Sequence, residues 1–238
     1  MSVQPAVQPP RRSASAVFRL SGRATVLLGL VIALALVYAT DQIVPATSDR
    51  QAQLRIWLAA RAAGIAAYLL LSFQVSLGLV LSHPTNKSTW RLSKRLFPWH
   101  EQLWVFVTAF LAVHIVSIVA DPYAGVGLLG AVVPGLSAYR SPAIALGTLS
   151  LYAFLLTAIT ARWTRRLPPG AWLSIHRVAI AVWALAWLHG VLAGSDSEPL
   201  ALVYIVTGLA LVAAAAYRYW MSRLGRPTFE ARRAKADA

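Results

Sequence analysis

The sequence predicts an all-α integral membrane protein, a bundle of six transmembrane helices with both termini in the cytoplasm. Of the 238 residues, 58% are hydrophobic and only 13% are charged, whereas a typical soluble domain is about 25% charged. The apolar residues form continuous runs near the length of about 20 residues that a helix needs to cross a bilayer. They lack the alternation of a membrane β-barrel. Basic and acidic loops alternate along the chain.

The first candidate span covers residues 24–40 and follows a polar, arginine-containing segment, residues 1–23. The composition of this segment predicts a disordered cytoplasmic tail. A positive start followed by an apolar run also resembles a signal peptide, with a candidate cleavage site at Ala33-Leu34-Ala35. The apolar run continues past that site, which favours an uncleaved first helix.

Five further apolar segments complete the predicted transmembrane domain, which covers residues 24–220. Pro142 suits the start of the fourth span, and Pro168-Pro169-Gly170 separates the fourth span from the fifth. A basic cytoplasmic tail, residues 221–238, follows the last span. The five segments are residues 54–82, 100–120, 142–161, 171–193 and 199–220.

The distribution of charge predicts the orientation of the bundle. The formal net charge is +14, and most basic residues lie in the two tails and in the second and fourth loops. Positive loops stay on the cytoplasmic side. The third and fifth spans then both run from inside to outside. The basic residues fill the gaps between apolar runs instead of one face, so we expect contacts with membrane lipid and no nucleic-acid partner. The other loops hold the acidic residues Asp41, Asp49, Asp121, Asp196 and Glu198.

Four histidines lie on the third and fifth spans, where an ionisable side chain is costly and therefore indicates a function. Fourteen residues separate His100 from His114, and thirteen separate His176 from His189. At 1.5 Å per residue these spacings correspond to ~21 and ~20 Å. Because the two spans run in the same direction, the histidines match in depth, and each level offers two imidazoles on opposing helices.

Two imidazoles at one level suit the axial positions of a six-coordinate haem, because imidazole is a good ligand for iron. The chain has no cysteine, which excludes thiolate ligation and covalent haem attachment. We therefore predict two haem b groups as cofactors, with His100 and His176 on one iron and His114 and His189 on the other. The alternative is that each histidine is buried and hydrogen-bonded across helices.

Helical periodicity agrees with only one of the two spacings. Fourteen residues bring His100 and His114 to a common face, but thirteen residues fall ~140° short of four turns. The fifth span therefore needs an irregularity, which we expect near Pro168-Pro169-Gly170 or Gly190.

The spacings His-x13-His on the third span and His-x12-His on the fifth resemble those of the ferric reductase-like transmembrane domain family. This family includes NADPH oxidases, ferric reductases and the haem subunit of the bacterial methionine sulfoxide reductase system. The resemblance covers roughly residues 54–193, and Arg61-Ala62-Ala63-Gly64 is similar to the family's arginine-containing start of the second helix. It implies an inner haem on His100 and His176, an outer haem on His114 and His189, and electron flow outward.

The same resemblance implies a separate electron donor. The oxidases of this family append a flavin- and nicotinamide-binding region after the sixth helix, whereas only residues 221–238 follow here. We therefore expect that the chain has no FAD or NAD(P) site and that a separate flavoprotein reductase or a quinone is the electron donor. We also expect the protein in the plasma membrane. The acceptor could be ferric iron, oxygen or an extracytoplasmic protein. The chain is then an oxidoreductase or the haem-carrying subunit of one.

Arg61 lies at about the same depth as His114, ~10 Å from the start of its segment. We predict that it binds a propionate of the outer haem or the acceptor; the alternative is an arginine that snorkels to the interface. Gly64 and Gly78 are also fourteen residues apart and favour close helix packing, or else room for a flat macrocycle. His83 is expected in a loop, with ligation of the inner haem as an alternative.

Phe110 and Trp183 lie between the two histidine levels, where core packing is expected and a part in electron passage is the alternative. Residues 125–130 match the pattern Gly-x-Gly-x-x-Gly, but a dinucleotide site also needs a preceding strand. We interpret this stretch as a flexible or re-entrant turn.

The rival function is a transporter or structural membrane protein whose histidines carry protons or a metal. Such proteins more often contain broken helices and several intramembrane carboxylates. Glu101 is the only acidic residue within a proposed span, at its very start, which favours electron transfer.

Overall fold

A computed structural model describes residues 22–43, 48–82, 90–168, 170–195 and 197–224. Within these residues every regular element is a helix, which confirms the all-α prediction. His83 lies outside the described residues, as do residues 1–21 of the predicted N-terminal tail and most of the C-terminal tail. The elements are α1 (Gly22–Ile43), α2 (Asp49–Leu81), α3 (Trp90–Ala120), α4 (Gly127–Val132), α5 (Ser141–Arg162), the short 3-10 helix η2 (Thr164–Arg166), α6 (Ala171–His176), α7 (Ala179–Ala193) and α8 (Ala201–Leu224).

Five segments of the described chain are long and apolar enough to cross a membrane, and they correspond to the second to sixth predicted spans. Their bounds are Leu54–Leu81, Ser93–Ala120, Ser141–Arg162, Ala171–Ala193 and Ala201–Arg223. Helix α1 packs against α3 but is not among these five. A sixth crossing therefore stays a prediction.

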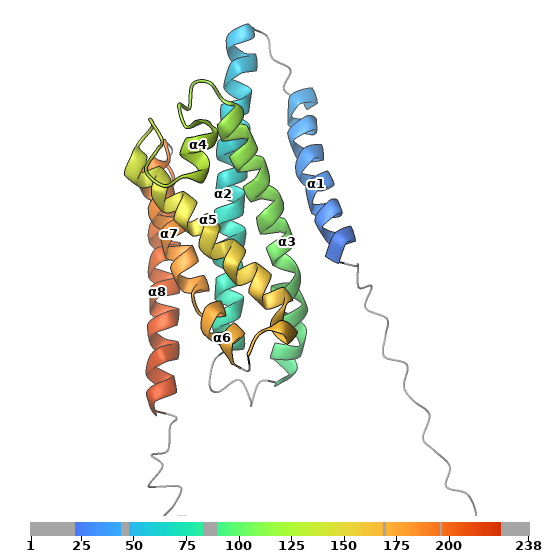
Figure 1. Ribbon diagram of the computed structural model, residues 1–238, viewed down its shortest axis with the longest axis vertical. Helices are drawn as coiled ribbons and strands as arrows, with labels where there is room; N and C mark the ends of the chain where they lie inside the picture. The colour runs from blue at the N-terminus through green and yellow to red at the C-terminus, as the bar shows by residue number, and fades with distance from the viewer. Residues whose placement is uncertain (1–21, 44–47, 83–89, 169, 196, 225–238) are drawn as a thin grey trace, which may run out of the picture.

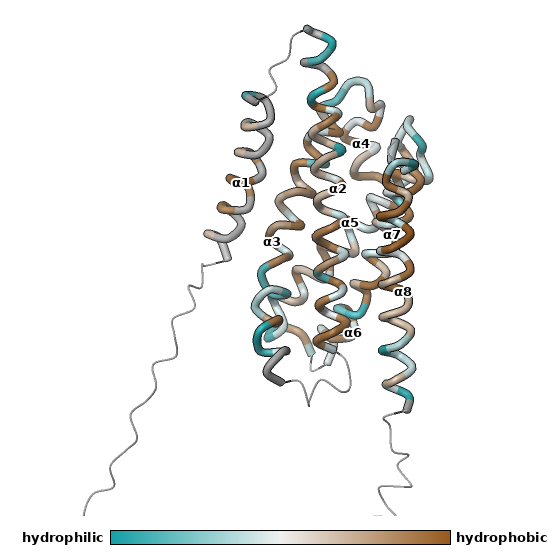
Figure 2. Tube along the Cα trace, turned by 180° about the vertical axis from the view of Figure 1, so that it is seen from behind, coloured by the Kyte–Doolittle hydropathy of each residue, from teal (hydrophilic) through white to brown (hydrophobic). Residues whose placement is uncertain are grey.

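The helices form an elongated bundle in which α2 packs against α3, α7 and α8, and α5 packs against α7 (Figure 1). One end of the bundle, here called the inner end, holds the start of α3, the end of α5, and α6. The opposite, outer end holds α4. Polar residues gather toward these ends, while the middle of the bundle is largely hydrophobic (Figure 2).

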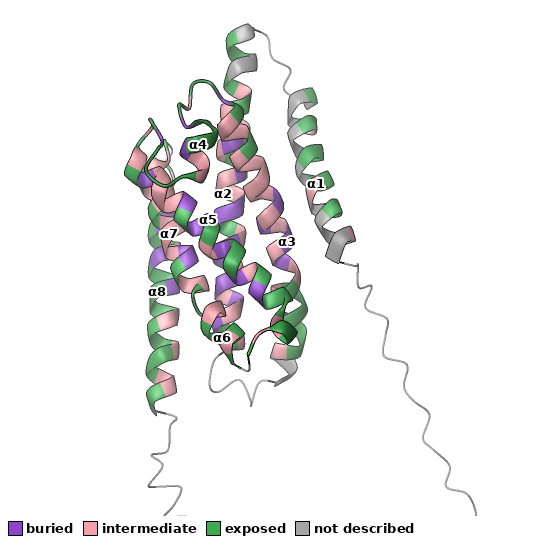
Figure 3. Ribbon diagram, viewed as in Figure 1, coloured by how far each residue is buried: buried purple, intermediate pink, exposed green. Residues whose placement is uncertain are grey.

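Many large apolar side chains lie on the outside of the bundle, as the exposed face of α8 illustrates (Figure 3). Leu202 and Leu209 are 72% and 69% exposed, and Val116 on α3 is 68% exposed. Contiguous apolar surface of this kind is unfavourable in water. It suits the hydrocarbon of a bilayer, in agreement with a multi-pass membrane protein.

Helix α3 begins earlier than the sequence indicates. The stretch up to Pro98 was expected to be a loop, but α3 begins at Trp90 and continues through Pro98 without interruption of the helix. Proline removes one backbone donor, and a membrane bundle tolerates this loss where neighbouring groups satisfy the freed carbonyl. Lys94 and Arg95 are therefore helical and exposed at the inner end.

The predicted fifth span consists of two helices, α6 and α7, joined at Arg177 and Val178. The Val178 N–H donates to the Ile175 carbonyl over 2.9 Å, a tightened 3-10 bond in place of the α-helical pattern. The irregularity needed for the thirteen-residue spacing thus lies between the two predicted places. As a result, His176 and His189 belong to different helices.

The core of the bundle lies between the two histidine levels. The Trp183 indole N–H donates to Ser72 Oγ over 3.0 Å, and the Ser150 hydroxyl donates to the Val182 carbonyl over 2.8 Å. Trp183 therefore packs in the core as expected, whereas Phe110 is not part of the buried cluster. The buried members are Tyr68, Leu71, Val75, Leu79, Val107, Phe154, Val182, Trp183, Tyr204 and Leu211.

The glycine-rich stretch at the outer end forms a turn and a short helix. Gly125 and Gly127 adopt positive φ angles of 63° and 60°, and α4 starts at Gly127. No strand precedes it among the described residues. The βαβ context of a dinucleotide site is therefore missing from this part of the chain.

Candidate functional site

The four histidines meet in two pairs. The ring centroids of His100 and His176 are 6.0 Å apart, with ring planes at 89°. Those of His114 and His189 are 6.3 Å apart, with planes at 74°. The first pair lies toward the inner end and the second toward the outer end. The partners are those expected from depth along the spans.

The spacing within each pair fits one metal ion between two imidazoles. A bond from imidazole nitrogen to a metal measures about 2.0–2.1 Å, and the ring centroid lies about 1.1 Å behind that nitrogen. Two rings on opposite sides of one metal therefore have centroids about 6.3 Å apart. The observed 6.0 and 6.3 Å are close to this value.

Backbone carbonyls fix the orientation of three of the four rings. Because a carbonyl only accepts, the imidazole Nδ1 must carry the proton in each bond. Nε2 then keeps its lone pair for a metal, the usual arrangement of a ligating histidine. The three bonds run from His100 to Gln74 over 3.0 Å, from His114 to Ala60 over 2.7 Å and from His189 to Ala143 over 2.9 Å.

The same three rings each lie against a glycine. A Cβ atom on Gly64 would come within 2.8 Å of His114 Nδ1, and one on Gly147 would come within 2.8 Å of His189 Nδ1. A Cβ on Gly78 would approach His100 Cε1 to 3.2 Å. Gly64 and Gly78 thus make room for histidine rings, beyond the helix packing expected of them. Gly147 was not singled out from the sequence, because nothing in its spacing relates it to His189.

His176 is held differently from the other three histidines. Its Nδ1 is buried and has no hydrogen-bond partner among the described residues. The ring lies 5.8 Å from the ring of Trp172, centroid to centroid. The inner pair therefore combines one ring that is tied to the backbone with one that is not.

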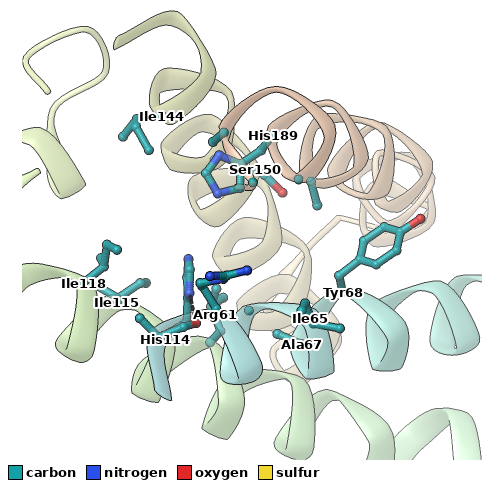
Figure 4. Close-up of a pocket in the computed structure, with 18 of the residues that line it drawn as sticks. Arg61, Ile65, Ala67, Tyr68, His114, Ile115, Ile118, Ile144, Ser150 and His189 are labelled. Carbon is teal, nitrogen blue, oxygen red and sulfur yellow. Dashed lines mark hydrogen bonds between the residues drawn. The ribbon is translucent and has the colours of Figure 1, made fainter. Parts of the chain in front are cut away.

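A cavity of about 420 Å³ lies around the outer histidine pair and reaches from the outer end into the buried core of the bundle. Its volume is within the usual range for ligand pockets. His189 lies on one side of it, and Arg61 and His114 lie on the opposite side (Figure 4). Its walls are mainly apolar. The Arg61 guanidinium stacks over the Trp57 ring, 3.9 Å from the centroid, and gives the cavity a positive charge near the outer pair.

A protein-only metal centre has little support in the described part of the chain. No group of three or more His, Cys, Asp or Glu side chains gathers there, whereas a structural or catalytic metal usually takes at least three protein ligands. Two facing imidazoles fit an iron whose remaining ligands come from a macrocycle. Two ligands at this spacing therefore fit a haem iron better than a bare ion.

Comparison with known proteins identifies the family of this chain. A family model described as the ferric reductase like transmembrane component matches residues 63–187, more than half of the chain. The chain belongs to the ferric reductase-like transmembrane family. No curated protein and no solved structure matches it.

Membership confirms the family expected from the histidine spacing, and it indicates transmembrane electron transfer by a haem-binding domain. The matched residues include His100, His114 and His176. Arg61 and His189 lie just outside them. The match covers a range and names no ligands, so the assignment of all five residues depends on the geometry described above.

Proposed function

We propose that this ferric reductase-like protein carries electrons across the membrane through two b-type haems. His100 and His176 hold the inner haem, and His114 and His189 hold the outer one. The observation that carries the proposal is the separation of the ring centroids, 6.0 and 6.3 Å, which is close to the value of about 6.3 Å for two imidazoles on one metal.

The protein residues fix the position and the environment of the cofactor. A bound haem supplies the redox couple itself. The carbonyls of Gln74, Ala60 and Ala143 hold three imidazoles in one tautomer, and such hydrogen bonds increase the basicity of the ligand. The buried side chains of the core between the two levels are mainly apolar.

Arg61 and the cavity around it form the outer part of the site. A guanidinium recognises carboxylates well, and Arg61 lines the same cavity as both outer histidines. We assign it to a propionate of the outer haem or to the acceptor. The acceptor is ferric iron, oxygen or an extracytoplasmic reductase.

Electrons pass from the inner end to the outer end in this proposal. The inner end carries the exposed Lys94, Arg95, Arg165 and Arg166, and positive charge marks the cytoplasmic side. We therefore place a six-span bundle in the plasma membrane with its inner end in the cytoplasm. The electron donor is a separate flavoprotein reductase or a quinone.

The decisive experiment measures haem in the purified full-length protein. A dithionite-reduced minus oxidised spectrum should show b-type bands, and pyridine haemochrome should give about two haems per chain. The double variant His114→Ala/His189→Ala should keep one haem, as should His100→Ala/His176→Ala. His83→Ala is the matched control and should keep both. A colourless protein from haem-replete cells contradicts the proposal.

A further inference from the structure

Helix α6 brings one aromatic side chain from the surface of the inner end to the inner histidine pair. Trp172 is 36% exposed, and its ring lies 5.8 Å from that of His176. The helix is only six residues long, and it ends at His176 itself. Among the described residues, this ring therefore links solvent-accessible surface to an inner histidine.

Exposed arginines flank this short helix on both sides in the sequence. Arg165 and Arg166 belong to η2 before it, and Arg177 follows directly after His176. Helix α5, which precedes η2, packs against α6. No acidic residue occurs between positions 122 and 195, so no carboxylate of this part of the chain neutralises the three guanidinium groups.

We propose that Arg165, Arg166 and Arg177 form the docking surface for an acidic, flavin-carrying electron-donor protein, and that electrons enter the inner site at Trp172. This inference rests on the proposed function, because it assigns the place where electrons enter the inner site. One electron passes from the reduced flavin of the donor, which is oxidised, to the iron at the inner pair, which is reduced. No bond between the two proteins forms or breaks.

Charge complementarity identifies the occupant of this surface. Opposite charges steer two proteins together and can raise association rates by about 10- to 1,000-fold at low salt. In the sequence, the three arginines flank the short helix that carries Trp172 and His176, so a partner attracted by them arrives at the segment whose surface ring lies beside an inner histidine. Anionic lipid headgroups would be attracted by the same charges. The experiment below distinguishes binding of a flavoprotein from binding of lipid headgroups.

The test uses the haem-loaded full chain in nanodiscs of zwitterionic lipid. Stopped-flow absorbance follows haem reduction by a fully reduced flavodoxin, a small acidic flavoprotein, at several ionic strengths. The variant Arg165→Gln/Arg166→Gln/Arg177→Gln should lower the second-order rate constant at least tenfold at low salt and flatten its salt dependence, by loss of steering. Reduction by free reduced riboflavin should stay within twofold of wild type.

Two variants separate docking from electron passage. Trp172→Leu should leave the donor concentration at half-saturation unchanged and lower the limiting rate, because it removes the ring beside His176 without changing charge. Arg223→Gln, an exposed arginine at the same end on α8, is the matched control and should react as wild type. If Arg223→Gln is as slow as the triple variant, the effect is general surface charge and the surface is assigned wrongly.

Binding of the flavoprotein to the nanodiscs can be measured whether or not the chain contains haem. This measurement distinguishes failure of the proposed function from failure of the docking surface. A colourless chain that still binds flavodoxin through the three arginines would overturn the proposed function and keep the docking surface. A haem-containing chain whose triple variant binds and reacts like wild type would overturn the docking surface alone. If the triple variant loses flavodoxin binding only in nanodiscs of anionic lipid, the three arginines bind lipid headgroups. That result would also overturn the docking surface.

Discussion

A glycine opposite a histidine ring is the feature on which the geometry of three of the four histidines depends. Gly64, Gly78 and Gly147 lie so close to the rings that a β-carbon would collide with them or press on them. The absence of a side chain allows α2 and α5 to approach the rings and to offer them backbone carbonyls. Close approach and the Nδ1 hydrogen bond are therefore two consequences of the same small residue.

The variant Gly147→Ala should displace His189. The new Cβ would lie 2.8 Å from Nδ1 and 2.9 Å from Cε1 of this ring, and both helix backbones resist movement in a packed bundle. We expect haem content to fall from about two to about one per chain, with loss of the outer haem. Pyridine haemochrome of the purified protein measures this.

Gly208→Ala is the control for this prediction, because the three atoms nearest to its Cβ would all belong to the Trp187 ring, the first at 3.3 Å, and none to a histidine. Gly78→Ala should have the milder effect on the inner haem, since its closest contact is 3.2 Å. A Gly147→Ala protein that keeps two haems and an unchanged spectrum would show that the ring can move without loss of its ligand role.

Arg61 offers a second prediction at the scale of one residue. Arg61 lines the outer cavity together with His114 and His189. Loss of its positive charge should stabilise the ferric form of a neighbouring haem relative to the ferrous form. Arg61→Ala should therefore lower the midpoint potential of one haem and leave the other unchanged. A spectroelectrochemical titration resolves the two.

Arg50→Ala provides the comparison for the Arg61 variant, because Arg50 is an exposed residue in the first turn of the same helix. Identical potentials in wild type and Arg61→Ala would remove the assigned role and leave Arg61 as an interfacial arginine stacked on Trp57.

At the scale of elements, the junction of α6 and α7 decides whether both histidines of this span can face α3. A straight helix would turn His176 and His189 ~140° apart over thirteen residues. The junction at Arg177 and Val178 allows each helix to point its histidine separately, one at His100 and the other at His114. The two levels of the site are therefore built on independent elements.

An alanine inserted between Arg177 and Val178 should abolish the inner site only. One extra residue rotates α6 by about 100° and shifts it by about 1.5 Å relative to α7, which turns His176 away from His100. His189 stays on α7 beside His114. We expect one haem per chain with the properties of the outer haem.

An alanine inserted after Leu136 is the control for the junction. Leu136 is 60% exposed in the segment between α4 and α5, so an extra residue there should leave two haems. Equal loss from both insertions would mean that haem content reports general misfolding instead of the position of His176.

The sequence predicts the pairing of the histidines correctly, but it misplaces the α6–α7 junction and the start of α3. Depth along parallel spans was enough to pair His100 with His176 and His114 with His189, because rise per residue is nearly constant in any helix. Rotation is not constant, so the junction at Arg177 was placed wrongly. The start of α3 at Trp90 was missed because Pro98 and the basic residues before it resemble a loop, while a membrane bundle tolerates them in a helix.

Contacts between segments far apart in the chain were beyond sequence reasoning. Gly147 and the carbonyls of Ala60 and Ala143 carry no residue type or spacing that relates them to a histidine. The same holds for Trp172, whose importance comes from the short helix that brings it beside His176. Such relations exist only once the packing of α2, α5, α6 and α7 is known.

At the scale of the whole molecule, the apolar surface indicates a membrane protein, and the unequal charge of the two ends is the basis for the orientation that we propose. Five segments of the described chain meet the requirements for crossing, and the exposed leucines and valines along them need lipid contacts. The inner end is basic, whereas Asp121 and Glu198 lie at the outer end. With the inner end in the cytoplasm, five crossings place the start of α2 outside.

The position of the N-terminus then decides whether α1 is a sixth crossing. The chain contains no cysteine, so single cysteines can be labelled without background. In intact cells, Leu136→Cys should react with a membrane-impermeant maleimide, while Ala238→Cys should react only after permeabilisation. Ser13→Cys should behave like Ala238→Cys if α1 crosses, because one more crossing returns the chain to the cytoplasm. Labelling of Ser13→Cys in intact cells would reduce the bundle to five crossings, and labelling of Ala238→Cys there would reverse the orientation on which outward electron flow depends.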